Sequence, residues 1–186
     1  LRKGVLQKLR ENDEQLSPYP PVTHFLPETK TPPTALKKYV AVKKVLSGLH
    51  EPEAEMFDLS QKSLSRAKFY GKHCQGNVEL DLQKPSYTIR AEHHGNIEFR
   101  RLSQKNGGSI KGELDKGLQE RRLTVRECAR IQTFPDDFDF VIDNPNGRKM
   151  LLNGTEGYVV VGNAVPPLLA YHFAHRIESK WDLYFK

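Results

Sequence analysis

Hydrophobic positions are most regular near the C-terminal end of the chain. Leu169, Phe173, Ile177 and Trp181 follow one another at intervals of four residues. Residues at this spacing lie on one face of an α-helix. The proline pair at 166–167 fits the first turn of such a helix, because a proline there lacks only an N–H group that would have no helical partner. The pattern predicts a strongly amphipathic terminal helix.

A second helix is predicted after residue 124. Thr124 and Glu127 form the capping-box pattern, in which each side chain bonds the backbone N–H of the other residue. Val125 and Cys128 then share one face, and Pro135 is expected to end the helix. On this face Cys128 is expected to be a buried, inert thiol rather than a nucleophile.

Two weaker apolar stretches precede and follow this helix. Residues 37–49 place apolar side chains at helical spacing before Gly48, which predicts a helix that ends there. Residues 158–161, Tyr-Val-Val-Val, are expected to form a short buried segment. The first 13 residues are interpreted as a short amphipathic helix or as the frayed end of a larger element.

The periodicity changes between residues 78 and 102. Three short runs, at 78–82, 86–91 and 97–102, are bounded by turn-prone residues such as Lys84-Pro85. They predict short strands of a small, twisted, mixed or antiparallel sheet. With the helices, this gives an α+β fold.

Polar stretches connect these elements. The proline-rich residues 17–36 are expected to form an extended linker, because each proline fixes its backbone and removes a hydrogen-bond donor. Residues 51–60 form an acidic loop, and residues 136–157 are polar and turn-rich. The glycine-rich residues 103–120 are expected to form a flexible loop.

Composition limits the classes of protein to which the chain can belong. No apolar stretch approaches the roughly 18 residues of a transmembrane helix, and the first residues lack the apolar run of a signal peptide. Two cysteines cannot form a disulfide framework, so a reducing, cytoplasmic setting is expected.

Positive charge is concentrated in one part of the chain. The formal net charge is +6, and residues 61–105 contain nine Lys and Arg residues against four Asp and Glu residues. Aromatic residues lie among these charges, a combination typical of surfaces that bind a polyanion such as DNA. The alternative is an ordinary solvated basic surface.

Common active-site motifs are absent from the sequence. It contains no G-x-G-x-x-G, no phosphate-binding loop, no H-E-x-x-H and no Cys-x-x-Cys pair. The pairs His73-Cys74 and His93-His94 are candidate zinc ligands by residue type, but structural zinc sites space their ligands two to four residues apart. We therefore expect histidines in loops or facing DNA, and no metal site.

Three groups of residues resemble motifs of one protein family. The segment 121–136 reads Arg-Arg-Leu-Thr-Val-Arg-Glu-Cys-Ala-Arg-Ile-Gln-Thr-Phe-Pro-Asp and resembles the ninth motif of the bacterial-type DNA (cytosine-5)-methyltransferases. Residues 162–167, Gly-Asn-Ala-Val-Pro-Pro, resemble the tenth. Gln75-Gly76 followed by Thr88-Ile89 resembles the target-recognition domain. The resemblance covers roughly residues 17–178 and keeps the order of the family.

The family's catalytic motifs are missing. The family uses a Pro-Cys nucleophile, a Glu-Asn-Val segment and a Phe-x-Gly-x-Gly loop for S-adenosylmethionine, and none of them occurs here. The resemblance therefore implies the C-terminal part of such an enzyme. Residues 1–17 would end the catalytic domain or form a linker, residues 18–120 would recognise DNA, and residues 121–186 would return to a Rossmann-like catalytic domain.

The resemblance also implies the functional residues. Contacts with double-stranded DNA would come from Lys72, Gln75, Gly76, Thr88, Ile89 and Arg90. Contacts with S-adenosylmethionine, shared with an N-terminal catalytic half, would come from Asn163, Ala164 and Val165. A structural role at the base of the recognition domain falls to Arg121, Thr124, Arg126 and Glu127.

Each assignment has a plainer alternative. Gln75 would be an ordinary turn residue and Thr88 a strand residue. Arg121, Arg126 and Glu127 would cap a helix and form surface ion pairs, and Asn163 would be a helix N-cap. For the whole chain, the alternatives are a non-catalytic DNA-binding subunit of a split enzyme and an inactive methyltransferase relic.

Overall fold

The computed structural model describes residues 19–25, 27–31, 34–52, 54, 59–91, 97–143, 146 and 149–185. The helix expected in residues 1–13 and the pair His93-His94 lie outside these ranges. The chain divides into two compact units, one of residues 39–164 and one that joins residues 1–38 to residues 165–186. The functional boundaries expected at residues 17 and 120 stay predictions.

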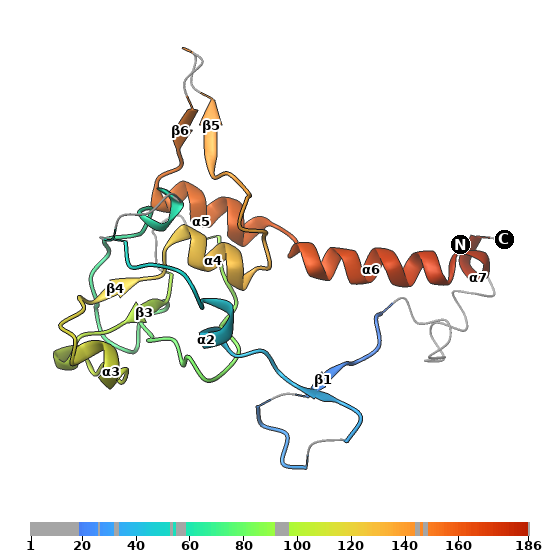
Figure 1. Cartoon of the computed structure of the whole chain (residues 1–186), viewed down its shortest axis with the longest axis horizontal. Helices are drawn as coiled ribbons and strands as arrows, with labels where there is room; N and C mark the ends of the chain where they lie inside the picture. Colours follow the sequence, from blue (N-terminus) through green and yellow to red (C-terminus); the bar gives the residue numbers. More distant parts are fainter. Residues whose placement is uncertain are drawn as a thin grey trace. The chain divides into compact units, whose positions relative to one another are not determined.

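The larger unit combines short strands with short helices (Figure 1). Its elements in chain order are α2 Val42–Val45, the 3₁₀ turn Leu59–Gln61, β3 Phe99–Arg101, the 3₁₀ turn Gln104–Asn106, α3 Lys111–Leu114, β4 Arg121–Arg122, α4 Val125–Ile131, β5 Val141–Asp143, β6 Lys149–Leu151 and α5 Gly154–Asn163. The expected mixture of helix and strand is confirmed.

Helices α4 and α5 pack side by side at the centre of this unit (Figure 1). Both begin with a complete capping box, Thr124 with Glu127 in α4 and Asn153 with Glu156 in α5. The helices approach closely because Gly157 has no side chain: a Cβ atom there would lie 2.4 Å from a Val125 methyl carbon. The helix predicted after residue 124 is thus confirmed, whereas the cap of α5 was missed.

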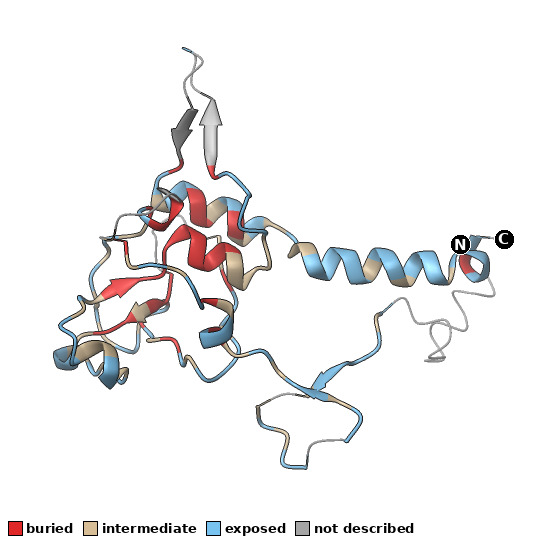
Figure 2. Ribbon diagram, viewed as in Figure 1, coloured by how far each residue is buried: buried red, intermediate tan, exposed pale blue. Residues whose placement is uncertain are grey.

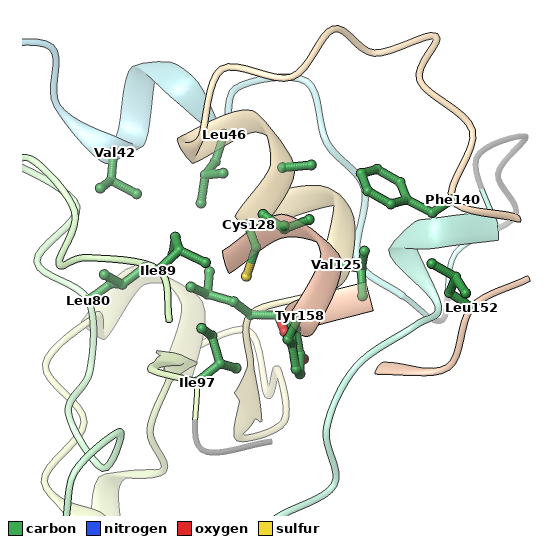
Figure 3. Packing of buried hydrophobic residues seen from close by; sticks show 13 residues of the cluster. Val42, Leu46, Leu80, Ile89, Ile97, Val125, Cys128, Phe140, Leu152 and Tyr158 are labelled. Carbon is green, nitrogen blue, oxygen red and sulfur yellow. The ribbon is translucent and has the colours of Figure 1, made fainter. Parts of the chain in front are cut away.

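A single hydrophobic core surrounds these two helices (Figure 3). Cys128 and Val125 on α4 face Tyr158 and Val161 on α5, and all four are buried. The segment 158–161 is therefore part of a helix, in which only some of its residues are buried. The expected burial of Cys128 is confirmed, and this burial raises the pKa of its thiol well above the usual value, which disfavours the reactive thiolate.

The predicted sheet is only partly present. Strand β3 confirms the run at 97–102 and pairs antiparallel with β4, placing Phe99 opposite Arg122. The run at 78–82 is confirmed only in part: it pairs in parallel with β3 at one bridge, Glu79 to Phe99, through two backbone hydrogen bonds of 2.9 Å. The run at 86–91 contains no strand, so that prediction is wrong. A side chain extends the short pairing, because the Glu79 carboxylate accepts the backbone N–H groups of Leu102 and Ser109, each at 2.7 Å.

Residues 103–120 are more regular than a flexible loop. They contain the second 3₁₀ turn and α3, and the Glu120 carboxylate accepts hydrogen bonds from Ser103 and Asn106. The predicted helix at 37–49 is restricted to the four residues of α2, and the turn-rich stretch 136–157 includes the antiparallel hairpin of β5 and β6.

The smaller unit contains β1 His24–Phe25, β2 Lys37–Lys38, α6 Pro167–Ser179 and α7 Trp181–Phe185. Strands β1 and β2 are parallel; β1 lies in the region expected to be a linker, and β2 lies at the start of the segment 37–49 that was expected to be a helix. The terminal helix is confirmed as α6, with Pro167 in its first turn, but it ends at Ser179, so Trp181 of the predicted apolar face lies in the separate helix α7. No residue of α6 is buried, and among the described residues no helix is long and apolar enough to cross a membrane.

Candidate nucleic-acid interface

Three arginines and three glutamates form a closed ring of alternating charge in the larger unit. Neighbouring members of the ring are 2.6 to 3.0 Å apart, except for one contact of 3.7 Å. In order around the ring they are Arg100, Glu113, Arg101, Glu51, Arg121 and Glu127. The ring joins β3, β4, α3, α4 and the loop at residue 51. It balances three positive charges with three negative charges.

The ring lies largely inside the protein, so the alternative of surface ion pairs is wrong for its members. The side chains of Arg101, Arg121 and Glu127 are 1%, 7% and 4% exposed. Burial opposes ionisation of Glu51, but hydrogen bonds from Arg121 and Arg101 outweigh it and lower its pKa to about 2. The pKa of Arg121 is raised for the same reason, because its partners outweigh its desolvation.

Arg122 has a different set of partners from its neighbour Arg121. Its guanidinium donates to the carbonyl oxygens of Ala67 (2.8 Å), Lys68 (3.2 Å), Gly76 (2.8 Å) and Ile97. A further bond of 3.2 Å reaches the side-chain oxygen of Asn77. All five acceptors are uncharged, and burial lowers the pKa of Arg122. The side chain therefore fastens the two ends of the loop 67–77, which carries Lys72 and Gln75.

Arg126 fastens another turn by similar contacts. It donates to the carbonyl oxygens of Pro135 (3.2 Å) and Phe138 (2.7 Å) and to the hydroxyl of Ser60. Its guanidinium lies over the Phe140 ring at 5.0 Å, as that of Arg122 lies over Phe99 at 4.1 Å. Arg122 and Arg126 are thus chemically similar clamps on different segments.

The loop 67–77 presents its candidate DNA-binding side chains to solvent. Lys72 and Gln75 are exposed, whereas Gly76 is buried with a positive φ of 72°. That backbone conformation favours glycine, because other residues meet a steric penalty there. Gly76 therefore shapes the loop and offers its carbonyl to Arg122, while the exposed side chains around it are available for a ligand.

Residues 88–90, the second segment predicted to contact DNA, lie partly on the surface and partly in the core. Thr88 is exposed, but Ile89 is only 4% exposed and belongs to the core cluster (Figure 3). Arg90 forms a 2.9 Å ion pair with Glu98. Of these three side chains, only that of Thr88 is fully accessible to DNA, and Ile89 serves to anchor it.

The basic region 61–105 also has two kinds of cation. Arg90, Arg100 and Arg101 pair with carboxylates of the protein. The exposed cations are mostly lysines, of which Lys84 also pairs with the exposed Asp81 at 3.5 Å: Lys62, Arg66, Lys68, Lys72, Lys84 and Lys105. The available charge is thus smaller than the sequence count implies, but it includes Lys72 on the loop 67–77.

The Gly-Asn segment follows α5. Asn163 is the last residue of that helix and is exposed, Ala164 is partly buried, and Val165 is 66% exposed. Asn163 is not the N-cap of the next helix, because Pro166 occupies that position, so the N-cap alternative is wrong. Position 162 requires glycine, because a Cβ atom there would lie 2.4 Å from the backbone of Arg90 and Ala91.

Sequence reasoning missed several residues that shape this interface. Arg122 stands within the segment that resembles the ninth motif, and its position next to Arg121 was the only signal that it mattered. Glu51 and Glu113 pair with Arg121 and Arg101, which lie 70 and 12 residues away, so no local pattern connects them to the ring. Among the described residues, no group of three or more His, Cys, Asp and Glu residues is arranged to hold a metal ion.

Comparison with known proteins shows to which family the chain belongs. A family model described as C-5 cytosine-specific DNA methylase matches residues 5–179. The chain belongs to this family of DNA (cytosine-5)-methyltransferases. Its members methylate cytosine in DNA and use S-adenosylmethionine as methyl donor.

Several curated relatives are Type II methyltransferases. M.MthTI from Methanothermobacter thermautotrophicus is 30% identical over 159 residues, which make up 79% of this chain and 46% of that protein. M.NgoPII from Neisseria gonorrhoeae is 48% identical over 109 residues, or 59% of this chain and 24% of that protein. M.BspRI from Lysinibacillus sphaericus is 28% identical over 168 residues, or 87% of this chain and 35% of that protein. The chain thus spans less than half of the length of these relatives.

Proposed function

We propose that this chain is the DNA-recognition portion of a cytosine-5 methyltransferase and corresponds to the C-terminal part of the enzyme. It recognises a duplex sequence and supplies one wall of the methyl-donor site, while an N-terminal half carries the cysteine nucleophile. The observation that carries the proposal is the loop 67–77. It exposes Lys72 and Gln75 while Arg122 of the ninth motif fastens its two ends.

The exposed side chains of the loop suit two separate tasks. Lys72 and the neighbouring lysines attract phosphates, which provides affinity for any duplex sequence. Gln75 is uncharged, and its amide offers both donors and acceptors to base edges. An enzyme that flips cytosine out of the stack leaves its partner base unpaired. Gln75 is suited to hydrogen-bond this orphan base.

Thr88 is suited to the DNA backbone. Its hydroxyl is exposed, while Ile89 beside it is fixed in the core, so the hydroxyl has a rigid base. Hydroxyl groups are common phosphate ligands and hold a protein in register on the duplex. Thr88 would therefore position the distorted strand rather than identify bases.

The methyl-donor contacts involve only a few groups of this chain. Asn163 offers an exposed amide and Val165 an exposed apolar side chain, which suit a molecule with polar and aromatic parts. These residues fit one wall of an S-adenosylmethionine site, and the donor would supply the methyl group when bound. The remaining walls and the nucleophile are assigned to the N-terminal half.

Salt-dependent binding tests the proposal. The chain is titrated against a fluorescent duplex of mixed sequence, and the slope of log affinity against log salt is measured. Lys72→Ala should reduce the slope by about one unit, because one phosphate contact is lost. Gln75→Ala should leave the slope unchanged. Lys43→Ala is the matched control, since Lys43 is an exposed lysine on α2, outside the basic region.

Two results would contradict the proposal. One is the absence of salt-dependent binding by the unmodified chain. The other is an equal change of slope in the Lys72 and Lys43 variants, because the loop would then have no special place on the DNA.

The second candidate function is a non-catalytic DNA-binding subunit that targets a separate catalytic chain. It is favoured by the absence of a Pro-Cys pair from the sequence. The two candidates share the DNA-binding surface and differ in the gene: a Pro-Cys motif upstream in the same reading frame supports a single enzyme, and a separate frame supports a split one.

A further inference from the structure

The loop 67–77 has little regular structure of its own. It contains no helix or strand, and Gly71 and Gly76 both have positive φ values, of 101° and 72°. Its internal backbone hydrogen bonds are local turns, from Cys74 to Gly71 and from Asn77 to Cys74. Local turns fix the shape of a loop, but they do not fix its position relative to the rest of the protein. The position of the loop on the protein therefore depends on contacts from outside it.

Arg122 supplies such contacts at both ends of the loop. Ala67 and Lys68 lie at its start, and Gly76 and Asn77 lie at its end. A guanidinium has five N–H donors in a rigid plane, so one side chain can hold four oxygen atoms of the loop in fixed relative positions. A lysine ammonium is a single point with three donors and cannot reproduce this geometry.

The guanidinium is itself held in place. Its plane lies over the Phe99 ring at 4.1 Å, and Phe69 of the loop packs edge-on against the same ring at 6.0 Å. Asn77 extends the network, because the side-chain oxygen that accepts from Arg122 also accepts the backbone N–H of Tyr70. Strand β4, the Phe99 ring and the loop thus form one connected assembly.

Arg122 is suited to positioning and not to binding DNA directly. It is 1% exposed, so a phosphate or base could reach it only after the loop opened. Its neighbour Arg121 binds carboxylates of the ring, which gives the two adjacent arginines different tasks. Arg121 joins the elements of the unit, and Arg122 holds the loop 67–77.

We infer that Arg122 is a positioning residue for sequence recognition: its guanidinium holds the loop 67–77 in the conformation that presents Gln75 to the DNA. The inference rests on the proposed function and adds a residue that itself does not touch DNA. Loss of the guanidinium should therefore reduce discrimination between sequences, while the affinity that comes from exposed lysines remains.

The experiment compares two matched variants, Arg122→Lys and Arg126→Lys. Both remove a buried guanidinium that lies over a phenylalanine ring and donates to backbone carbonyls, but only Arg122 contacts the loop. A preferred duplex is selected from a randomised pool with the unmodified chain. The Kd ratio of a scrambled duplex to this duplex is then measured, together with the salt slope and the free energy of unfolding.

Arg122→Lys should lower the Kd ratio by about tenfold, the effect of losing recognition at one base pair, and leave the salt slope unchanged. Arg126→Lys should lose stability to a similar extent and keep the ratio. Equal ratios in the two variants would overturn the inference, because Arg122 would then be only structural. A wild-type chain that does not discriminate between sequences would instead contradict the proposed function.

A smaller change covers the case in which Arg122→Lys does not fold. Asn77→Ser removes one of the five oxygen acceptors and the link to Tyr70 but keeps the four carbonyl contacts. It should lower the Kd ratio several-fold with an unchanged salt slope. A ratio equal to that of the wild type would overturn the inference.

Discussion

The segment 121–129 and helix α6 differ in what surrounds them. All nine residues from Arg121 to Ala129 are buried, including four that carry charge, whereas none of the thirteen residues of α6 is buried (Figure 2). The more polar segment is the more buried one. Hydrophobicity alone therefore does not decide burial here: the charged groups of the first segment have partners within the same unit, whereas α6 stays largely exposed even though Phe173 packs edge-on against Tyr19.

The two segments also differ in how far their structure could be predicted. The apolar spacing and the proline of α6 predicted the helix, and the capping box predicted α4, because helices and caps depend on neighbours within a few residues. Burial of Arg121 and Glu127 was not predicted, because their partners Glu51 and Arg100 are distant in sequence. Long-range ion pairs leave no periodic signal.

Disruption of the charge ring should have the largest effect on stability. Arg121→Ala leaves Glu127 with only the 3.7 Å contact to Arg100 within the ring and leaves Glu51 with Arg101, so the free energy of unfolding should fall by about 3–5 kcal/mol. Lys84→Ala is the control, because Lys84 forms an exposed pair with Asp81 and its loss should cost under about 1 kcal/mol. Chemical denaturation measures both. Equal losses would mean that the ring contributes no more than a surface pair.

Adding a side chain between α4 and α5 should have the second-largest effect on stability. Gly157→Ala places a Cβ atom 2.4 Å from a Val125 methyl carbon and should destabilise the unit by about 1–3 kcal/mol. Gly112→Ala is its control, because Gly112 lies in α3 and a Cβ atom added there would meet no other atom within 4 Å. The control should be neutral or slightly stabilising, since alanine favours a helix. A neutral Gly157 variant would show that the helices can separate without cost.

Acid should weaken the charge ring. The pKa of Glu51 is about 2 in the folded state, below its ordinary value, so its contribution to stability is complete above about pH 4.5. It should decline as the pH falls from about 4.5 towards 2. Glu51→Gln should flatten this part of the stability curve measured by thermal unfolding. An unchanged curve in the variant would show that Glu51 is not coupled to folding.

Substitution on α6 should have the smallest effect on the stability of the larger unit. Ile177→Lys changes a residue that is 36% exposed, so the unfolding free energy should stay within about 0.5 kcal/mol of wild type. The same change should reduce binding of a hydrophobic dye by the chain, because the apolar stripe is interrupted. A strictly monomeric wild-type chain without dye binding would show that α6 packs within the chain after all.

The candidate site was predictable in part. The motif resemblance directed attention to Gln75 and Thr88, and both side chains are exposed. The runs at 78–82 and 86–91 were expected to be strands, but Glu79 satisfies nearby backbone donors with its carboxylate, and Gly162 of α5 approaches the backbone at 90–91. In both runs, contacts with residues distant in sequence take the place of a full ladder of hydrogen bonds between strands. Such contacts cannot be predicted from the local pattern of residues.

This chain is proposed to recognise DNA without itself transferring the methyl group. The direct measurement incubates the purified chain with labelled S-adenosylmethionine and with the duplex that it selects from a randomised pool. We expect sequence-selective binding without labelled cytosine, because the sequence contains no Pro-Cys nucleophile. Stoichiometric methylation of cytosine by the chain alone would contradict this assignment.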